Sequence, residues 1–481
     1  MIFSGLPFLL GFLPLTLCGF AVSSRFGEAA AKYWLIAVSL LFYGVGARAF
    51  LPLLILSVGC NFLLLRRMHG SVHAGQWAAV GVALNLSVLF WFKYLALDPL
   101  PPLGLSFFTF SQIGCLLHFA SGDKPPPFAR DYALFAGFFP ALLAGPILNP
   151  GETLQQFTRA GNWRLTADNL SVGFGFFLIG LLKKTLLANH MSGLVADGFA
   201  DPAHLTMLPA WEVATGYSLQ LYFDFSGYTD MAIGLAWMFG LRFPDNFARP
   251  YRAASVIEYW QRWHMSLTRF LMSNVHAPLT MAILRWRRSQ GLPIGQVAQR
   301  TWIGFLSMIG VPVAMTMALV SLWHGGTLTF LVFGLLHTAF LLVNHLWRLH
   351  QAPALPKIAS VALTYLCILV ASIFFRAPAV SVAGSLIAAM IGLHGASLGQ
   401  ADIHVVLDVA WILGLYVIVW SFPSTRHLMQ APVMQAPVMQ TGAAGLLTWR
   451  PSPRWAVIMG CAATLGLLAT GGSTEFVYFR F

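Results

Sequence analysis

The chain has 481 residues, of which 58% are hydrophobic and only 9% are charged. A soluble protein carries roughly a quarter charged residues because its surface faces water, so this composition excludes an ordinary soluble enzyme. The net charge of +12 does not indicate nucleic-acid binding here, because the basic residues fall between apolar runs, as in "LLLRRMHG", "LIGLLKKTLL" and "LRWRRSQG". We interpret them, Lys183 and Lys184 included, as loop charges that fix the orientation of a membrane protein.

Apolar runs long enough to cross a bilayer as a helix, about 20 residues, recur along the whole chain. The runs are too continuous for a transmembrane β-barrel, whose strands alternate in short segments. We therefore predict an all-α fold, a polytopic transmembrane helical bundle of about ten to twelve spans, some of them re-entrant. The candidate spans are residues 1–22, 33–65 (expected to hold two helices), 77–97, 103–120, 132–148, 170–188, 211–241, 301–320, 326–347, 358–375, 404–422 and 455–470.

The polar stretches between these runs are short, and none is long enough to form a soluble domain. We predict a single membrane domain over 1–481, with N-terminal helices in 1–131, a core in 132–392 and C-terminal helices in 393–481. The last part holds a polar loop at 423–454, whose repeat "MQAPVMQAPVMQ" we interpret as a duplication in a surface loop. The five cysteines stand singly in apolar context, which predicts neither a metal site nor a disulfide framework.

Two prolines interrupt the run "FFPALLAGPIL", at Pro140 and Pro146. A broken helix at membrane depth is tolerated only where protein or a water-filled cavity satisfies the freed backbone groups. We therefore expect this segment to line an internal cavity, with the smoother spans facing lipid.

Two carboxylates stand inside the apolar run 217–241, at Asp224 and Asp230. An Asp at the centre of a membrane helix costs about 2.5–3.5 kcal/mol, so such residues normally face a bundle interior or a wet cavity. Each has a polar neighbour four residues away on its own helix face, Tyr228 for Asp224 and Ser226 for Asp230. The pattern favours buried hydrogen bonds between helices, and a direct chemical role is the alternative.

The segment 255–275, "SVIEYWQRWHMSLTRFLMSNV", predicts an amphipathic helix at the membrane interface. Its apolar residues recur at helical spacing, at Val256, Trp260, Trp263, Leu267 and Phe270, away from Glu258, Arg262 and Arg269. His264 borders the buried side of this helix. A lone histidine on an apolar face is usually a core residue, so this pattern alone favours packing over catalysis.

His324 is a stronger candidate. It lies near the middle of the 47 uncharged residues between Arg300 and Arg348, flanked by Trp323 and by two glycines that permit a tight backbone. Imidazole has an unperturbed pKa of about 6.5 and can be buried neutral, yet can still accept a proton. These properties fit a general base aimed at a hydroxyl group. His337 and His345, on the next predicted helix, could equally be packing residues.

Common catalytic motifs are missing from the sequence. There is no GxSxG elbow, no phosphate-binding GxxxxGK[ST] loop, no GxGxxG after a strand and no HExxH. Isolated side chains must therefore carry any chemistry.

Taken together, several motifs resemble the membrane-bound O-acyltransferase (MBOAT) family, within it the bacterial branch of alginate O-acetylation membrane subunits. The resemblance covers nearly the whole chain, through "LGLSFFTFSQIGCLLHF", "FFPALLAGPILNP", "LYFDFSGYTDMAIGLAWMFGLRFPDNFARPY", "VIEYWQRWHMSLTRFL", "SLWHGG", "IFFRAP" and "EFVYFRF". The near-invariant histidine of the family falls on His324, and its second characteristic histidine falls on His264.

The resemblance implies a bundle around a central funnel in the bacterial inner membrane, with His324 as the base and His264 as a contributor to oxyanion stabilisation. Substrate-lining or supporting positions are then expected at Trp323, Asp224, Asp230, Tyr222, Ser321 and His337. No bound cofactor or metal is implied. The implied partners are membrane lipid, a cytoplasmic acyl thioester donor such as acetyl-CoA, a secreted polysaccharide such as alginate or cellulose, and a periplasmic SGNH-type acyltransferase.

The chain departs from the family in two places. After "TRFL" the family has an Asp-Tyr pair and an aromatic-Ile-Pro-Leu-Gly-Gly run, where this chain has "MSNVHAPLTMAILRWRR". The family motif Trp-Gly-x-x-His-Gly is represented by Phe333-Gly334 with His337-Thr338. D-alanyl transfer to teichoic acid from a carrier protein, and a proton-coupled transporter that uses the two aspartates and His324, are the alternatives.

Overall fold

The computed structural model describes residues 2–96, 102–159, 161–396, 403–429, 449 and 452–472. Throughout these residues the regular structure is helical, and no strand occurs among them. Seven helical segments in this part of the chain are long and apolar enough to cross a membrane, and four shorter apolar helices accompany them. The prediction of an all-α polytopic bundle is therefore confirmed. The repeat at 429–440 lies, apart from Met429, outside the described residues.

The described chain divides into two compact units, which we treat separately. Unit 1 comprises the described parts of 1–189, 223–246 and 423–480, and unit 2 those of 190–222 and 247–422. Helix α11 (Met207–Met238) contributes its first half to unit 2 and its second half to unit 1. The predicted single domain and its internal boundaries stay a prediction.

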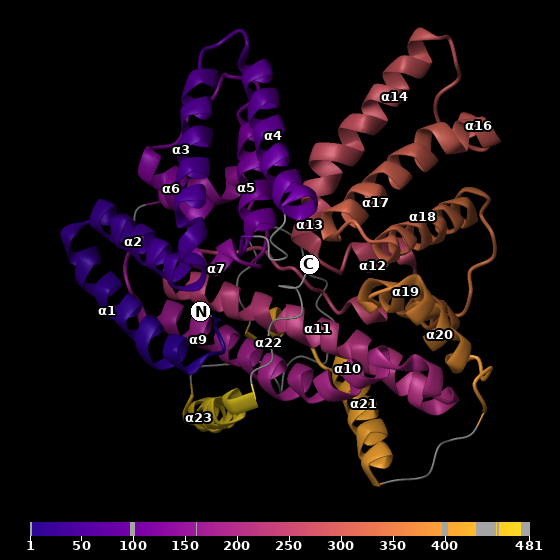
Figure 1. The fold of residues 1–481 in the computed structure, drawn as a ribbon. Coiled ribbons are helices and arrows are strands. Elements are labelled where there is room, and N and C mark those ends of the chain that lie inside the picture. Colours follow the sequence, from indigo (N-terminus) through magenta and orange to yellow (C-terminus); the bar gives the residue numbers. More distant parts are fainter. Residues whose placement is uncertain are drawn as a thin grey trace. The chain divides into compact units, whose positions relative to one another are not determined.

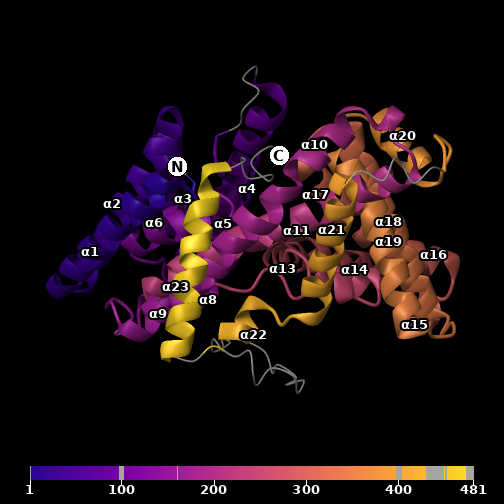
Figure 2. The same cartoon turned by 90° about the horizontal axis from the view of Figure 1, so that it is seen from below.

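Unit 1 contains most of the N-terminal helices and two C-terminal ones (Figures 1 and 2). The run 33–65 forms two helices as expected, divided at Arg48–Phe50. Helix α23 lies beside α9. The helices are η1 (Pro7–Phe12), α1 (Leu13–Ser23), α2 (Glu28–Ala47), α3 (Leu51–Met68), α4 (Ala74–Phe90), α5 (Leu105–His118), α6 (Ala129–Gly137), α7 (Phe139–Leu142), α8 (Pro150–Phe157), α9 (Ala167–Leu182), η5 (Lys183–Ala188), α22 (Thr425–Met429) and α23 (Pro453–Leu468).

The proline-interrupted run of unit 1 is broken as expected. Helix α6 ends at Gly137, and Pro140 stands in the first turn of α7, where its missing N–H costs nothing. Nearly all residues of 138–148 are buried, so protein surrounds this irregular backbone. The cavity expected beside it stays a prediction.

Four glycines bring α9 and the second half of α11 into backbone contact. A Cβ on Gly180 would lie 2.4 Å from the carbonyl oxygen of Gly227, and one on Gly173 would lie 2.6 Å from that of Gly234. The spacing is seven residues on both helices, so the two contacts fall on one face of each. Small residues at such spacing are typical of tightly packed membrane helices.

Unit 2 contains the helices that carry the candidate histidines (Figure 1). Besides the first half of α11 they are α10 (Ser192–Ala200), α12 (Val256–Trp260), α13 (Met265–Leu271), η9 (Met272–His276), α14 (Ala277–Ser289), α15 (Gln296–Gln299), α16 (Trp302–Phe305), η10 (Leu306–Gly310), α17 (Val311–His324), α18 (Leu328–Leu349), α19 (Lys357–Arg376), α20 (Val380–Met390) and α21 (Ile403–Ser421).

Residues 265–324 form an antiparallel helical hairpin, which we call the arm (Figure 1). One leg is α13–η9–α14 and the other is α16–η10–α17. His276 contacts Thr316 at 3.3 Å, and Arg287 donates to the hydroxyl of Ser307 at 2.8 Å nearer the tip. The arm therefore begins just after His264 and ends at His324, and both histidines lie at its base.

The amphipathic helix expected over 255–275 is not continuous. Helix α12 ends at Trp260, the chain turns through His264, and α13 begins at Met265. His264 adopts a left-handed conformation with φ 44°, which is uncommon outside glycine and is found among other residues mainly in Asn, Asp and His. That conformation ends one helix and starts another, so the single-helix prediction was wrong.

Candidate functional site

His324 is the last residue of α17 and is 6% exposed. The backbone leaves the helix at Gly325, whose N–H closes the last turn on the carbonyl of Ser321 at 3.1 Å. A Cβ on Gly325 would lie 2.8 Å from the ring of Phe330. The glycine that follows His324 therefore allows an aromatic ring to approach the end of the helix.

Aromatic rings surround the His324 imidazole. Phe375 of α19 meets it edge-on with ring centroids 4.6 Å apart, and Phe330 and Phe333 of α18 lie at 5.9 and 6.2 Å. Trp323, its chain neighbour, lies at 4.4 Å. These four rings, the aromatic cage, exclude most water from the imidazole. A proton transfer or a developing charge there meets a low local dielectric, where electrostatic effects are stronger than in water.

The turn that presents His264 is built by local hydrogen bonds. Ser255 caps α12 by accepting from the N–H of Glu258 at 3.2 Å, and Glu258 accepts from the N–H of Ala254 at 2.7 Å. Arg262 donates to Glu258 at 2.5 Å and to the carbonyl of Ala248 at 3.3 Å. These hydrogen bonds fix the backbone on the N-terminal side of His264. The His264 side chain is 1% exposed, and its backbone is left-handed.

Trp323 links the two candidate histidines. Its ring lies 6.0 Å from that of His264 and is adjacent to His324. The structure therefore brings together two histidines 60 residues apart in the sequence. The catalytic roles of the two histidines, and the division of roles between them, stay predictions.

His337 lies on α18 close to the cage. Its ring is 4.5 Å from that of Phe333, and its Nδ1 accepts a hydrogen bond from the indole N–H of Trp260 at 3.3 Å. His337 is 2% exposed.

The other predicted positions in unit 2 have structural surroundings. Ser321 donates to the carbonyl of Met317 at 3.0 Å and touches the backbone of α18. Tyr222 lies in an aromatic cluster, 6.1 Å from Phe247, 5.5 Å from Tyr251 and 6.4 Å from Trp263 between ring centroids. This cluster packs against Trp263, the residue that precedes His264.

Asp224 and Asp230 belong to unit 1 and pair with lysines of η5. Lys184 lies 2.6 Å from Asp224, and Lys183 lies 2.6 Å from Asp230. We interpreted both lysines as loop charges, and that interpretation was wrong: Lys184 is 4% exposed and Asp224 1%. A buried charge needs a paired and hydrogen-bonded partner, and each lysine supplies one for an aspartate. The glycine-mediated contact between α9 and α11 brings the lysines, which follow α9, close to the aspartates of α11. This geometry supports the structural interpretation of the two aspartates.

Short helix α22 extends this polar group. Thr425 donates to Asp230 at 2.6 Å and accepts from Lys183 at 2.9 Å. Its neighbour Arg426 lies 2.5 Å from Asp245, in the loop that follows α11. Burial raises the pKa of the Asp245 carboxyl, and the charge of Arg426 opposes that change. The helix is therefore tied to the rest of unit 1 by one ion pair and by the hydrogen bonds of Thr425.

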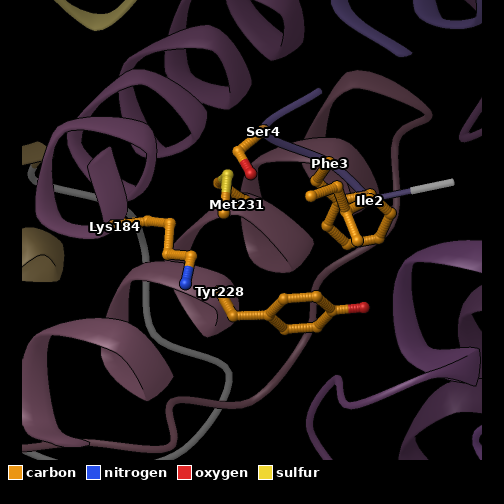
Figure 3. Close-up of a pocket in the computed structure, with 6 residues that line it drawn as sticks. All are labelled: Ile2, Phe3, Ser4, Lys184, Tyr228 and Met231. Atoms are coloured by element: carbon orange, nitrogen blue, oxygen red, sulfur yellow. The ribbon is translucent and has the colours of Figure 1, made fainter. Parts of the chain in front are cut away.

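Unit 1 also contains a small cavity beside Lys184 (Figure 3). Phe3 stacks on Tyr228 at 4.9 Å between ring centroids and forms part of its wall. The lining residues are Ile2, Phe3, Ser4, Lys184, Tyr228 and Met231. In the part of the chain that the structure describes, no three His, Cys, Asp or Glu residues gather as metal ligands.

Sequence reasoning missed the aromatic cage and the lysine partners. Phe330, Phe333 and Phe375 looked like ordinary apolar residues of their spans. The two lysines did carry a signal, because a Lys-Lys pair inside an otherwise mostly apolar run, here "LIGLLKKTLLA", can belong to a span. Asp224 and Asp230, in another predicted span, are residues of opposite charge with which the two lysines could be expected to pair.

Comparison with known proteins agrees with this geometry. The model of the membrane-bound O-acyltransferase family matches residues 76–290. The peptidoglycan O-acetyltransferase of Helicobacter pylori is 31% identical, over 83% of this chain and 81% of that protein. A probable alginate O-acetylase AlgI of Azotobacter vinelandii is 29% identical over the whole of both chains. The teichoic acid D-alanyltransferase of Bacillus subtilis is 26% identical over 50% of this chain and 58% of that protein.

Two histidines at the base of a membrane hairpin, and relatives aligned over most of the chain, lead to one conclusion. This multi-pass membrane protein is an acyltransferase and belongs to the membrane-bound O-acyltransferase family.

Proposed function

We propose that this protein works in the bacterial inner membrane and moves an acetyl group from a cytoplasmic thioester to hydroxyl groups of a polysaccharide outside that membrane. The observation that carries the proposal is that Trp323, one of the four rings of the aromatic cage, contacts both His264 and His324. The other implied partner, a periplasmic SGNH-type acyltransferase, belongs to the same proposal.

The distribution of charge supports the direction of transfer. Residues 259–401 contain nine Lys and Arg residues and no Asp or Glu. Six of the nine lie at the tip of the arm or at the ends of α18 and α19 that face each other across the loop 350–356: Arg285, Arg287, Arg288, Arg300, Arg348 and Lys357. Both places are at the ends of helices remote from His324. Cytoplasmic loops are enriched in Lys and Arg, so we assign these ends to the cytoplasm.

Helix length then sets the depth of the site. The span Trp302–His324 has 23 residues, which as a helix measures about 34 Å at 1.5 Å per residue. The hydrocarbon core of a bilayer is about 30 Å thick. His324 therefore lies far from the cytoplasmic surface. At this depth an acceptor hydroxyl can approach from the outer side, and an acyl donor must extend a narrow arm inward from the cytoplasm.

The chemistry follows from the two imidazoles. His324 accepts the proton of the acceptor hydroxyl while the hydroxyl oxygen attacks the carbonyl carbon of the thioester. His264 stabilises the oxyanion that forms. The carbon–sulfur bond then breaks, the thiolate leaves and takes the proton from His324, and an ester remains on the acceptor. No other reactant is needed.

The names of the relatives support a carbohydrate acceptor. One acts on peptidoglycan and another on alginate, and both polymers expose sugar hydroxyls. The D-alanyltransferases align with only about half of this chain, which favours acetyl over D-alanyl transfer. Alginate, cellulose, peptidoglycan and related polymers all fit this proposal.

Ester analysis of the cell envelope tests the proposal. Purified exopolysaccharide and peptidoglycan would be assayed for O-acetyl and D-alanyl esters in wild type, in a deletion strain, and in the deletion complemented with wild-type, His324→Ala or His345→Ala protein at matched expression. We expect acetyl esters to vanish on deletion and to return with wild type and His345→Ala only. Restoration by His324→Ala would overturn the assigned base, and unchanged esters in the deletion would overturn the transferase assignment.

A further inference from the structure

The hydrogen bond between Trp260 and His337 fixes one tautomer. An indole N–H can only donate, so the Nδ1 of His337 that accepts from it carries no proton. A neutral imidazole then carries its proton on Nε2 and presents an N–H donor there. Trp260 is 9% exposed, so water does not readily replace this hydrogen bond.

The Nε2 of His337 makes no hydrogen bond with any described residue. The side chain is nevertheless 98% removed from solvent, being 2% exposed. A packing residue such as leucine would place no polar N–H in these largely apolar surroundings. The side chain is thus suited to an acceptor atom that arrives with a ligand.

The position of His337 along α18 indicates which ligand it meets. Gly334 of α18 touches Ser321 of α17, and the two helices are antiparallel. His324, three residues after Ser321, is therefore level with the residue three positions before Gly334. His337 lies about six residues beyond that level, or about 9 Å, toward the basic end of α18. Phe333 contacts both imidazoles, with ring centroids 6.2 Å from that of His324 and 4.5 Å from that of His337. A donor that enters from the basic end passes His337 before its acyl carbon reaches His324.

We propose that His337, held by Trp260 as the Nε2–H tautomer, donates a hydrogen bond to a carbonyl oxygen of the acyl donor's pantetheine arm. This rests on the proposed function, since it concerns the donor side of the same site. A pantetheine thioester carries two amide carbonyls behind its acyl carbonyl, spaced along a chain narrow enough for an apolar passage. His337 is a donor-binding residue, and Trp260 is a positioning residue that acts through it.

Binding of an unreactive donor analogue separates this inference from catalysis. S-acetonyl-CoA replaces the thioester by a thioether ketone and keeps every carbonyl of the arm. Its affinity would be measured for purified protein in lipid nanodiscs, alongside a carrier protein that bears the same S-acetonyl pantetheine arm. The stronger binder of the two identifies the source of the arm.

We expect His337→Leu to weaken binding of the preferred analogue about tenfold, the loss of one buried hydrogen bond. His337→Gln, which keeps a side-chain N–H, should recover part of it, and Trp260→Phe should lose several-fold. In turnover assays the donor KM should rise in parallel, with kcat and the acceptor KM nearly unchanged. A purely structural role would lower kcat and the melting temperature without a donor-specific change in KM.

Matched controls are available on the same helix. His345→Leu removes another histidine of α18, and Trp347→Phe removes an indole N–H that donates to the carbonyl of Pro353 at 3.1 Å. Neither should change affinity for the analogue. Nitrogen-15 NMR of ring-labelled histidine should show a protonated Nε2 at His337 in wild type and a tautomer mixture in Trp260→Phe.

The outcomes distinguish the two proposals. Equal binding of the analogue by wild type and His337→Leu overturns the role of His337 and leaves the proposed transferase standing. Failure of both analogues to bind the wild type overturns the thioester donor, and this inference with it. A protonated Nδ1 at His337 in wild type overturns the tautomer assignment.

Discussion

Gly334 of α18 lies directly against the hydroxyl group of Ser321 on α17. A Cβ on Gly334 would stand 1.8 Å from Ser321 Oγ and 3.1 Å from the carbonyl oxygen of Met317, to which that hydroxyl donates. No side chain fits between the two helices at this level. The contact sets the separation of α17, which ends at His324, from α18, which carries two rings of the aromatic cage.

Replacement of Gly334 by alanine should therefore separate the two helices and displace His324. Forcing one methyl group into a packed interface typically costs about 1–3 kcal/mol. We expect a lower melting temperature in detergent and a loss of acyl transfer of about tenfold or more. Gly384→Ala on α20, where a Cβ meets nothing within 4 Å, is the control and should change neither quantity. Full activity of Gly334→Ala would show that the cage tolerates a wider spacing.

The Lys184–Asp224 pair makes a second prediction, on stability alone. Removal of one partner leaves the other as an uncompensated buried charge, so Lys184→Met should destabilise the protein by about 3–5 kcal/mol. The double variant Lys184→Met/Asp224→Leu removes both charges and should recover most of that loss. Thermal unfolding of the four proteins in one detergent gives the coupling between the two sites.

An exposed histidine–aspartate contact serves as the control for this cycle. His204 and Asp201 are 2.6 Å apart with side chains 84% and 60% exposed, and Asp201→Asn should leave the melting temperature unchanged. If the double variant is no more stable than Lys184→Met, the two side chains do not act as a pair, and another partner of the lysine must explain its burial.

Hydropathy was sufficient to predict a multi-pass helical membrane protein, because the length of a membrane helix is set by the bilayer. It could not predict where side chains meet across helices. His264 shows the difference: the apolar spacing of 255–275 fits one helix, yet hydrogen bonds from Ser255, Glu258 and Arg262 stabilise a turn that the spacing does not reveal. Phe375 reaches His324 from a span 51 residues later in the chain, and the hydropathy of that span does not identify it as a neighbour of His324.

The two histidines of the site differ in how far the sequence could identify them. His324 stands out because a polar group in an uncharged run of 47 residues needs a reason. His264 lies among arginines and tryptophans, where a histidine is unremarkable, and only the resemblance singled it out. Its backbone conformation is information that the structure adds.

The left-handed conformation of His264 allows its backbone role to be separated from its chemistry. Asparagine adopts this conformation more readily than most residues, so His264→Asn should keep the turn and the melting temperature. The same change removes the imidazole, and we expect acyl transfer to fall about 10²- to 10³-fold, as for loss of an oxyanion donor. Gln351→Asn, at another left-handed position (φ 51°), should leave activity unchanged. If His264→Asn stays active, the imidazole is not part of the chemistry.

The last prediction concerns the tip of the arm, where the buried Arg287 hydrogen-bonds to residues of the loop and of the other leg. Arg287 is 3% exposed and donates to the carbonyl of Pro293 through Nε and Nη2, at 3.2 and 2.9 Å, as well as to Ser307. Arg287→Met should leave these acceptors unsatisfied, at about 1–3 kcal/mol, and loosen the tip without touching the histidines. Proteinase K should then cut residues 290–300 about tenfold faster in inside-out membrane vesicles.

Arg288→Met makes the same change of charge one residue later, at an exposed side chain, so it should be cut at the wild-type rate. Equal rates for the two variants would mean that the Arg287 hydrogen bonds do not hold the tip. The sidedness of cutting carries a separate result. If the tip is cut in intact spheroplasts rather than in inside-out vesicles, the basic end faces outward. His337 would then lie on the acceptor side of His324, and the path assigned to the thioester donor would run in the opposite direction.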